Sequence, residues 1–228
     1  MKLGIILTSD NRSKAYLQKM IDNKIQLDEI IFMNNNEMLE VNNEIIQESI
    51  KNGFDISKSI KEILEKNNLK FIEFPFVDIN NIKIIDCVKN SNVDYFIFSG
   101  GGILKSDILQ SGKKFVHFHP GIVPEYRGST CFYYSIINEE NCGVTAFIMD
   151  EGLDTGNIIY QRTFKKPKNI YIDEVFDAHI RSETLIDVLK KELLLKNINK
   201  AQNPDNGNTY FIIHPVLKHI AILDCIKN

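Results

Sequence analysis

The sequence predicts an α/β protein with a mainly parallel sheet and flanking helices. Two apolar runs, Leu3 to Leu7 and Val93 to Phe98, are continuous rather than alternating, which is typical of strands buried on both faces of a parallel sheet. Segments with helical periodicity separate the apolar runs along the chain. Such alternation of strands and helices is typical of right-handed βαβ units, whose neighbouring strands run parallel.

The first half of the chain supplies four of the expected strands. Asp10 stands before an apolar-periodic stretch and is placed to cap its helix. We expect strands at 3–7, 28–33, 70–74 and 93–98, helical segments through 15–21, 45–46, 60–64 and 82–88, and a short helix from Ser106.

The second half continues the alternation and ends in a short extension. We expect strands at 115–118, 143–149, 158–164 and 209–213, a helix at 130–138 capped by Ser129 or Thr130, and a long amphipathic helix at 173–195. Asn206-Gly207 is a strong hairpin turn signal. The chain therefore divides into a main domain at 1–197 and a C-terminal hairpin and helix extension at 198–228, whose segment 206–213 is a candidate edge for a homodimer.

Composition narrows the class of protein. The chain has 228 residues, 43% of them hydrophobic, which suffices for one substantial core. A formal net charge of −3 favours neither nucleic acid nor a membrane as partner. The four cysteines lack the spacing of a metal site, so we expect reduced thiols and no metal. The apolar start is broken by Thr8-Ser9-Asp10 and is too short for a signal or a membrane span, so we expect a cytoplasmic protein.

Two motifs follow expected strands and carry the candidate chemistry. The first reads FVHFHPGIVPEYRGS at 115–129, where proline ends the strand after His119. The second reads GVTAFIMDEGLDTG at 143–156, where an apolar strand enters a turn rich in carboxylates. Strand ends are where open α/β sheets place their ligands. The sequence therefore predicts that an imidazole and a carboxylate meet at neighbouring strand ends.

Three consecutive glycines, 100–102, follow another expected strand. They lack the GxGxxG spacing of a dinucleotide site, and no suitably placed acidic residue follows. We interpret the segment as a tight turn lining a flat ligand, with Ile103 and Leu104 as its apolar wall.

The two motifs closely resemble those of the folate-dependent formyltransferase family. The similar residues are HPGxxPxYRG from His119 to Gly128, DEGLDTG from Asp150 to Gly156, and the upstream SGGGILK, within a resemblance that runs from about Val93 to Leu195. The resemblance implies a Rossmann-like catalytic core, a one-carbon transferase activity and 10-formyltetrahydrofolate as cosubstrate. The first ninety residues match only as a generic α/β half.

The family's catalytic residues are an Asn, a His two residues later and a distant Asp. The resemblance assigns the His to His119 and the Asp to Asp154, whereas the Asn position holds His117. His119, with an unperturbed pKa near 6.5, suits a base and proton carrier, and a neighbouring Asp154 would orient it and raise its pKa. His117 either donates to the oxyanion in place of the Asn or is a structural histidine.

The resemblance also assigns binding residues. The expected folate-binding residues are Gly101, Gly102, Ile103, Leu104, Met149, Asp150, Glu151 and Gly152, although Asp150 and Glu151 equally suit a role in shaping the loop. The expected acceptor-binding residues are Tyr126, Arg127 and Ser13. Arg127 suits a phosphate or a structural ion pair, and Ser13 suits a phosphate at a helix N-terminus.

The acceptor amine is inferred by comparing branches of the family. Only about thirty residues follow the long helix, without a basic cluster, which disfavours methionyl-tRNA; the segment after the first strand lacks the glycines of glycinamide ribonucleotide enzymes. We therefore expect an amino sugar linked to UDP or dTDP, used in surface polysaccharide synthesis. Alternatives are another small amine (an amino acid, a peptide or glycinamide ribonucleotide), water as acceptor, or an inactive folate-binding protein.

Overall fold

The structure of the chain is a computed structural model that describes residues 1–35, 41–100, 102–168, 170–196, 200–203 and 205–226. The chain forms two compact units, described separately below: residues 1–117 with 149–151, and residues 118–148 with 152–228. No helix within the described ranges is long and apolar enough to cross a membrane.

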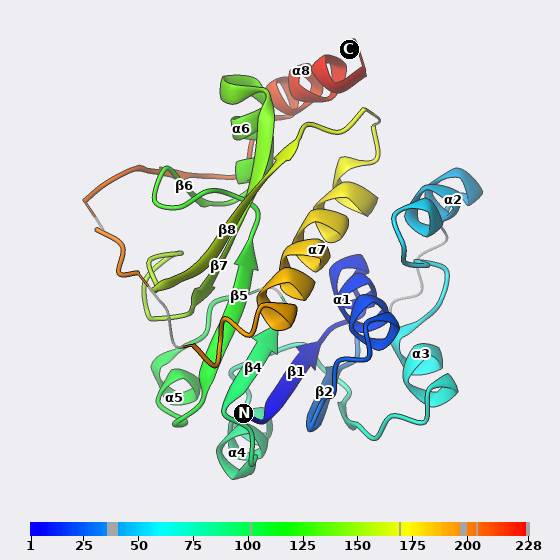
Figure 1. Ribbon diagram of the computed structural model, residues 1–228, viewed down its shortest axis with the longest axis vertical. Helices are drawn as coiled ribbons and strands as arrows, with labels where there is room; N and C mark the ends of the chain where they lie inside the picture. The colour runs from blue at the N-terminus through cyan, green and yellow to red at the C-terminus, as the bar shows by residue number, and fades with distance from the viewer. Residues whose placement is uncertain (36–40, 101, 169, 197–199, 204, 227–228) are drawn as a thin grey trace. The chain divides into compact units, whose positions relative to one another are not determined.

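The first unit contains a parallel sheet with helices between its strands (Figure 1). Strands β3, β2, β1, β4 and β5 are neighbours in that order, and each described pair is parallel. The elements are β1 (Leu3–Leu7), α1 (Asn11–Asp22), β2 (Glu29–Met33), α2 (Asn43–Lys51), α3 (Ile60–Lys66), β3 (Ile72–Phe74), α4 (Ile82–Asn90), β4 (Tyr95–Phe98), α5 (Ser106–Leu109) and β5 (Lys114–His119). The predicted α/β class with a mainly parallel sheet is therefore confirmed.

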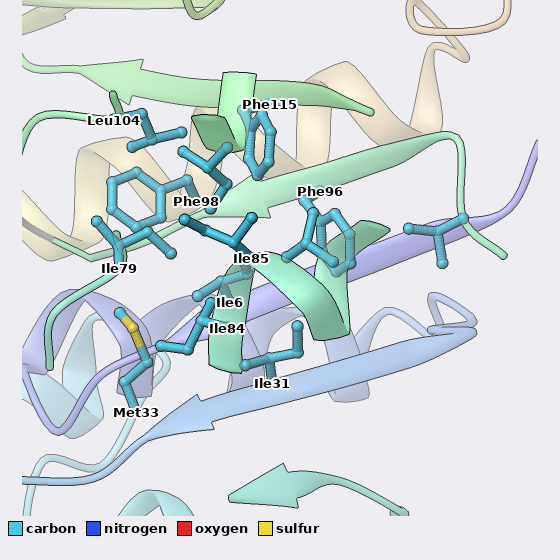
Figure 2. Packing of buried hydrophobic residues seen from close by; sticks show 13 residues of the cluster. Ile6, Ile31, Met33, Ile79, Ile84, Ile85, Phe96, Phe98, Leu104 and Phe115 are labelled. Atoms are coloured by element: carbon cyan, nitrogen blue, oxygen red, sulfur yellow. The ribbon is translucent and has the colours of Figure 1, made fainter. Parts of the chain in front are cut away.

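Buried aliphatic and aromatic side chains hold this sheet to its helices (Figure 2). Side chains of β1, β2, β4 and β5 pack with those of α4 and α5 in one cluster. β1 and β4 are buried along their whole length, as their continuous apolar runs predicted. Asp10 caps α1 by accepting the Ser13 N–H at 2.7 Å, which also follows the prediction.

Among its described residues, the second unit contains three α-helices, the last two strands of the seven-stranded sheet, β7 and β8, and the two-stranded sheet of β6 and β9 (Figure 1). β7 and β8 pair antiparallel, and β6 pairs in parallel with β9. The elements are β6 (Tyr126–Gly128), α6 (Cys131–Glu139), β7 (Asn141–Ile148), β8 (Ile158–Lys165), the π-helix η1 (Ile172–Phe176), α7 (Asp177–Lys190), β9 (Asn208–Tyr210) and α8 (Pro215–Ile226).

Two local predictions in this unit differ from the structure. The expected single helix at 173–195 starts as a π-helix, in which the Asp177 N–H donates to Ile172 O, and only then becomes α7. Thr130 stands at the N-cap position of α6, but its φ is +54° and its side chain makes no capping bond. The Thr130 hydroxyl instead donates to Ser129 O at 2.8 Å and accepts the Ile213 N–H at 2.9 Å.

The predicted hairpin at Asn206-Gly207 is also wrong, because β9 pairs with a strand that lies far from it in the sequence. β9 lies along β6, with Gly128 opposite Tyr210. A Cβ on Gly128 would lie 2.1 Å from Tyr210 O, so only glycine allows this approach. The long-range pairing satisfies the backbone of β9 without a hairpin. The proposed domain boundary at 197 and the homodimer edge stay predictions.

Candidate functional site

The two units carry different groups of the expected site residues. The second unit holds His119 at the end of β5, together with Tyr126, Arg127, Gly152 and Asp154. The first unit holds His117, Ser13, the described part of the glycine loop and residues 149–151. Each group is described within its own unit.

The loop after His119 is held by side chains of β7 and β8. Thr145 Oγ1 donates to Gly121 O at 2.7 Å and accepts the Val123 N–H at 3.1 Å. Gln161 Nε2 donates to Val123 O at 2.7 Å. The peptide between Val123 and Pro124 is cis. The hydroxyl and amide thus satisfy a buried turn that lacks regular secondary structure.

His119 is buried, and both of its ring nitrogens lie beside protein acceptors. Nε2 is 2.8 Å from Tyr126 O, and Nδ1 is 3.4 Å from Asp154 Oδ2. Because a carbonyl oxygen only accepts, the hydrogen of the neutral imidazole belongs on Nε2. Nδ1 is therefore the nitrogen that can take up a proton, on the side of Asp154. The structure thus brings the predicted imidazole and carboxylate together.

Asp154 is fixed by bonds to its carboxylate and to its backbone. Its Oδ2 accepts the Gly128 N–H at 2.8 Å. Its φ of +55° is left-handed, a conformation that Asp tolerates better than most residues. Gln202 Nε2 donates to Asp154 O at 3.0 Å and to Gly156 O at 2.7 Å, which clamps the turn from the C-terminal segment.

Burial and nearby charges act in opposite directions on His119. Burial lowers the pKa of its imidazole, and the Arg181 guanidinium lowers it too, whereas Asp154, the Tyr126 carbonyl and Asp177 raise it. The net result is a pKa below the ordinary value. Asp154 therefore acts in the predicted direction, but burial outweighs it because a charged ring loses its hydration.

The side chains of Tyr126 and Arg127 have partners inside the second unit. The Tyr126 hydroxyl donates to Glu139 Oε1 at 2.8 Å, its ring stacks on Tyr210, and burial raises its pKa to about 12. Arg127 Nη2 donates to Asn206 O at 2.7 Å. Both side chains are buried, and it is the backbone carbonyl of Tyr126 that faces His119.

His117 lies on β5 in the first unit and is partly buried. Its Nδ1 is 3.4 Å from Phe98 O, and its ring lies at 43° to the Phe98 ring. A neutral His117 that donates Nδ1–H to Phe98 O has no hydrogen on Nε2, so donation from Nε2 requires the other tautomer or the cation. An asparagine amide has no such requirement.

The glycine loop presents one exposed apolar side chain. Gly101 lies outside the described residues. Gly102 has a left-handed φ of +100°, and Ile103 after it is 71% exposed. Asn80 holds the loop, since its Nδ2 donates to Ile103 O at 2.9 Å and its Oδ1 accepts the Lys105 N–H at 2.8 Å. Leu104 is buried in the cluster of Figure 2.

Residues 149–152 lie after β7. Met149 packs against the same apolar cluster as Leu104, and its N–H donates to Phe115 O at 2.8 Å. Asp150 and Glu151 are exposed. In the second unit, a Cβ on Gly152 would lie 2.0 Å from Thr155 Oγ1, so this glycine keeps the turn compact. Ile103 is therefore exposed beside a left-handed glycine, whereas Leu104 and Met149 pack in the apolar cluster. Folate binding by these residues stays a prediction.

Ser13 is a buried structural residue in the first turn of α1. Its Oγ accepts the Thr8 N–H at 3.0 Å and lies 2.6 Å from Ser99 Oγ, which in turn donates to Ile6 O. These bonds tie the end of β1 to β4. The predicted phosphate contact of Ser13 has no structural test here and stays a prediction.

Sequence reasoning missed three groups that support His119 and Asp154. These are Thr145 in β7, Gln202 in the C-terminal segment, and the pair Asp177 and Arg181 in α7. The i, i+4 spacing of Asp177 and Arg181 is visible in the sequence as a helical ion pair. Nothing local in the sequence indicates that these side chains reach the two motifs.

A buried imidazole beside an anchored carboxylate, after strands of an α/β sheet, is an arrangement that can move a proton. Comparison with known families is in agreement: residues 5–166 match the family described as formyl transferase. The chain belongs to the formyl transferase family. The fold and family predictions from the sequence are therefore confirmed.

Relatives in sequence include two methionyl-tRNA formyltransferases. The protein from Clostridioides difficile is 35% identical over 174 residues, which cover 74% of this chain and 55% of the relative. The protein from Caldanaerobacter subterraneus is 28% identical over 174 residues, which cover 74% of this chain and 56% of that protein. The chain spans about half the length of these curated relatives.

Solved structures similar in fold include enzymes named for other acceptors. A sugar N-formyltransferase from Shewanella has a TM-score of 0.63 at 16% identity, covering 99% of this chain and 88% of that one. An N-formyltransferase from Helicobacter canadensis, in complex with folinic acid and dTDP-3-aminofucose, has a TM-score of 0.62 at 20% identity, covering 92% and 71%. A glycinamide ribonucleotide transformylase from Symbiobacterium toebii has a TM-score of 0.63 at 10% identity, covering 89% and 94%.

Proposed function

We propose that this chain transfers a formyl group from 10-formyltetrahydrofolate to the amine of an amino sugar linked to UDP or dTDP, in the cytoplasm, for surface polysaccharide synthesis. The observation that carries the transferase activity is the His119 and Asp154 pair, held by Tyr126 O and the Gly128 N–H. The family supports the donor, and one neighbour in fold was solved with folinic acid.

The pair supplies the proton route that formyl transfer requires. A bond forms between the amine nitrogen and the formyl carbon, the bond from that carbon to the folate nitrogen breaks, and the amine proton passes to the leaving nitrogen. The Asp154 side chain is 13% exposed and that of His119 only 3%, so the carboxylate is the more accessible group. Asp154 therefore receives the proton, and His119 Nδ1 behind it shares the charge.

His117 is the proposed donor to the oxyanion that develops on the formyl oxygen. A ring N–H replaces the asparagine amide of the family pattern, and donation from Nε2 uses the tautomer or the cation that carries a hydrogen there, because Nδ1 faces Phe98 O. The exposed side chain of Ile103 and the partly buried Met149 are the proposed apolar contacts of the pterin, and the buried Leu104 supports the loop from the core.

The nucleotide sugar is favoured by neighbours in fold, one of which was solved with dTDP-3-aminofucose. A second candidate acceptor, methionyl-tRNA, is favoured by the names of the sequence relatives. The two kinds of comparison point to different amines, so the acceptor must be identified by turnover.

The test is incubation of the purified protein with 10-formyltetrahydrofolate and separate acceptors: UDP-linked amino sugars, dTDP-linked amino sugars and methionyl-tRNA. Mass spectrometry reads formylation, and absorbance reads release of tetrahydrofolate. A formylated sugar is the expected result, and Asp154→Asn is the control that should abolish it. Formylated methionyl-tRNA would replace the sugar proposal. Release of tetrahydrofolate without an acceptor would indicate transfer of the formyl group to water. No release with any acceptor would contradict the proposed transferase activity.

A further inference from the structure

A buried ion pair lies behind the end of β5 in the second unit. Arg181 Nε donates to Asp177 Oδ1 at 2.7 Å, and the two side chains are 9% and 16% exposed. Asp177 is the first residue of α7, directly after the π-helical turn. Buried ion pairs contribute little net stability, because desolvation offsets their attraction. The pair therefore calls for an explanation other than stability.

The same guanidinium binds the backbone beside His119. Arg181 Nη1 donates to Phe118 O at 3.0 Å, and Phe118 is the residue before His119 on β5. A cation bonded to this carbonyl restrains the strand end that carries the imidazole. It also places a positive charge close to a ring that has almost no contact with solvent.

Four other groups face His119 from the elements around it. The carboxylate of Asp154 and the carbonyl of Tyr126 lie at its two nitrogens, and Asp177 lies on α7 with Arg181. Cys131 on α6 stays a neutral thiol at physiological pH, because burial raises its pKa to about 12. The positive charge of Arg181 thus opposes two carboxylates.

We propose that Arg181 is a positioning residue that holds the end of β5 and keeps the His119 imidazole uncharged until Asp154 receives the amine proton. The negative charge of Asp177 partly offsets the positive charge of Arg181. The role rests on the proposed function. Loss of Arg181 would make the cation less unfavourable, because acceptors lie at both ring nitrogens. A cationic ring has no free lone pair on Nδ1 with which to share the proton that Asp154 receives. Burial and Arg181 lower the pKa of His119, in keeping with this role.

The test is NMR titration of the His119 ring in the substrate-free full chain, assigned by comparison with His119→Gln. Arg181→Leu should raise the pKa of His119 by about one unit or more, since a nearby cation is lost. Asp177→Asn retains the Arg181 bond to Phe118 O and should shift the pKa downward. Arg181→Lys keeps the charge and should titrate close to the parent protein.

Controls separate this effect from loosening of the fold. Arg162→Leu is the control, because it breaks the ion pair between Arg162 on β8 and Asp187 on α7. It should leave the His119 titration unchanged. If Arg181→Leu does not fold, the double variant Arg181→Leu, Asp177→Asn removes both charges and should still raise the pKa. An unchanged titration, or shifts of the same sign in Asp177→Asn and in the variant that removes Arg181, would overturn the proposal.

A kinetic measurement connects the titration to the reaction. The acidic limb of the kcat/KM profile of the parent protein should lie at lower pH than that of Arg181→Leu, and the difference in pH should equal the pKa shift seen in NMR. The titration needs no substrate, so it holds or fails independently of the acceptor. If no acceptor is formylated but the pKa of His119 shifts in the variants as stated, the proposed function is wrong, whereas the effect of Arg181 on the charge of His119 is confirmed.

Discussion

The backbone N–H of Gly128 donates to Asp154 Oδ2 at 2.8 Å, and the same oxygen faces His119 Nδ1 at 3.4 Å. One carboxylate oxygen therefore joins the loop after β5 to the turn after β7. This bond orients Asp154 independently of His119, because a backbone donor keeps its place when the imidazole changes charge. The two motifs found in the sequence thus form one hydrogen-bonded arrangement.

Gly121→Ala should reduce turnover strongly. Its Cβ would lie 2.5 Å from Tyr126 O and 2.8 Å from His119 Nε2, so the two groups must separate. Such overpacking costs about 1–3 kcal/mol of stability. Gly112→Ala is the matched control: its φ is +80°, its Cβ would meet open space, and the strain costs about 1–2 kcal/mol. Urea unfolding and turnover should show similar stability losses and a loss of activity in Gly121→Ala alone. Equal activity in both variants would contradict this assignment.

Asp154→Asn and His119→Ala should each lower turnover by several orders of magnitude. Asn tolerates the left-handed φ of +55° and can still accept the Gly128 N–H, so the turn should survive. The variant loses only the charge that receives the amine proton. Circular dichroism checks the fold, and tetrahydrofolate release measures turnover. Nearly normal rates in either variant would remove the pair from the mechanism.

Gln202→Leu should lower kcat by roughly tenfold to a hundredfold through misplacement of Asp154. The variant loses two bonds, to Asp154 O and Gly156 O. Gln18→Leu is the control, because Gln18 Nε2 also bridges two carbonyls, Lys14 O and Asp55 O, in the first unit, and its Oε1 accepts a third bond from the Asp55 N–H. Each should lose about 1 kcal/mol per bond in urea unfolding. A similar drop in kcat for both variants would show a general effect of stability.

His117 should tolerate asparagine but not alanine. His117→Asn restores the family pattern and supplies an amide donor without a tautomer requirement, so it should keep measurable activity. His117→Ala removes the donor and should lose about a hundredfold in kcat. Single-turnover kinetics at saturating donor and acceptor separates this loss from binding. An alanine variant as active as the parent would show that His117 is structural.

The elements of the first unit could be predicted because each has a local signal. β1 and β4 are continuous apolar runs, and Asp10 caps α1 in the manner its position indicates. The partner of β9 could not be predicted, because its pairing depends on Gly128, some eighty residues earlier, rather than on the adjacent Asn206-Gly207. Strand pairing is a long-range property that turn signals describe only for neighbours.

The candidate site shows the same division. His119 and Asp154 stand in motifs, so the sequence indicates both residues and their meeting. Tyr126 also stands in a motif, but its side chain turns to Glu139 while its carbonyl serves His119, a distinction that residue type cannot reveal. Gln202 and Arg181 act through backbone carbonyls, which leave no pattern in a single sequence.

The lowered pKa of His119 predicts a loss of stability in acid. Between its native pKa and the unfolded value near 6.5, the unfolded chain binds a proton that the native chain does not. The free energy of unfolding should therefore decrease as pH falls below about 6.5, by at most about 1.4 kcal/mol per pH unit from this group. Above that pH the contribution is constant.

His119→Gln should remove this part of the slope. Urea unfolding at pH 7.5, 6.0 and 5.0 compares the variant with the parent, and His219→Gln, which changes an exposed histidine on α8, is the control. The carboxylates titrate in all three proteins, so their contribution cancels in the difference. The parent and His219→Gln should become less stable in acid more steeply than His119→Gln. Parallel pH dependences of all three would mean that His119 takes up its proton as readily in the folded chain as in the unfolded one.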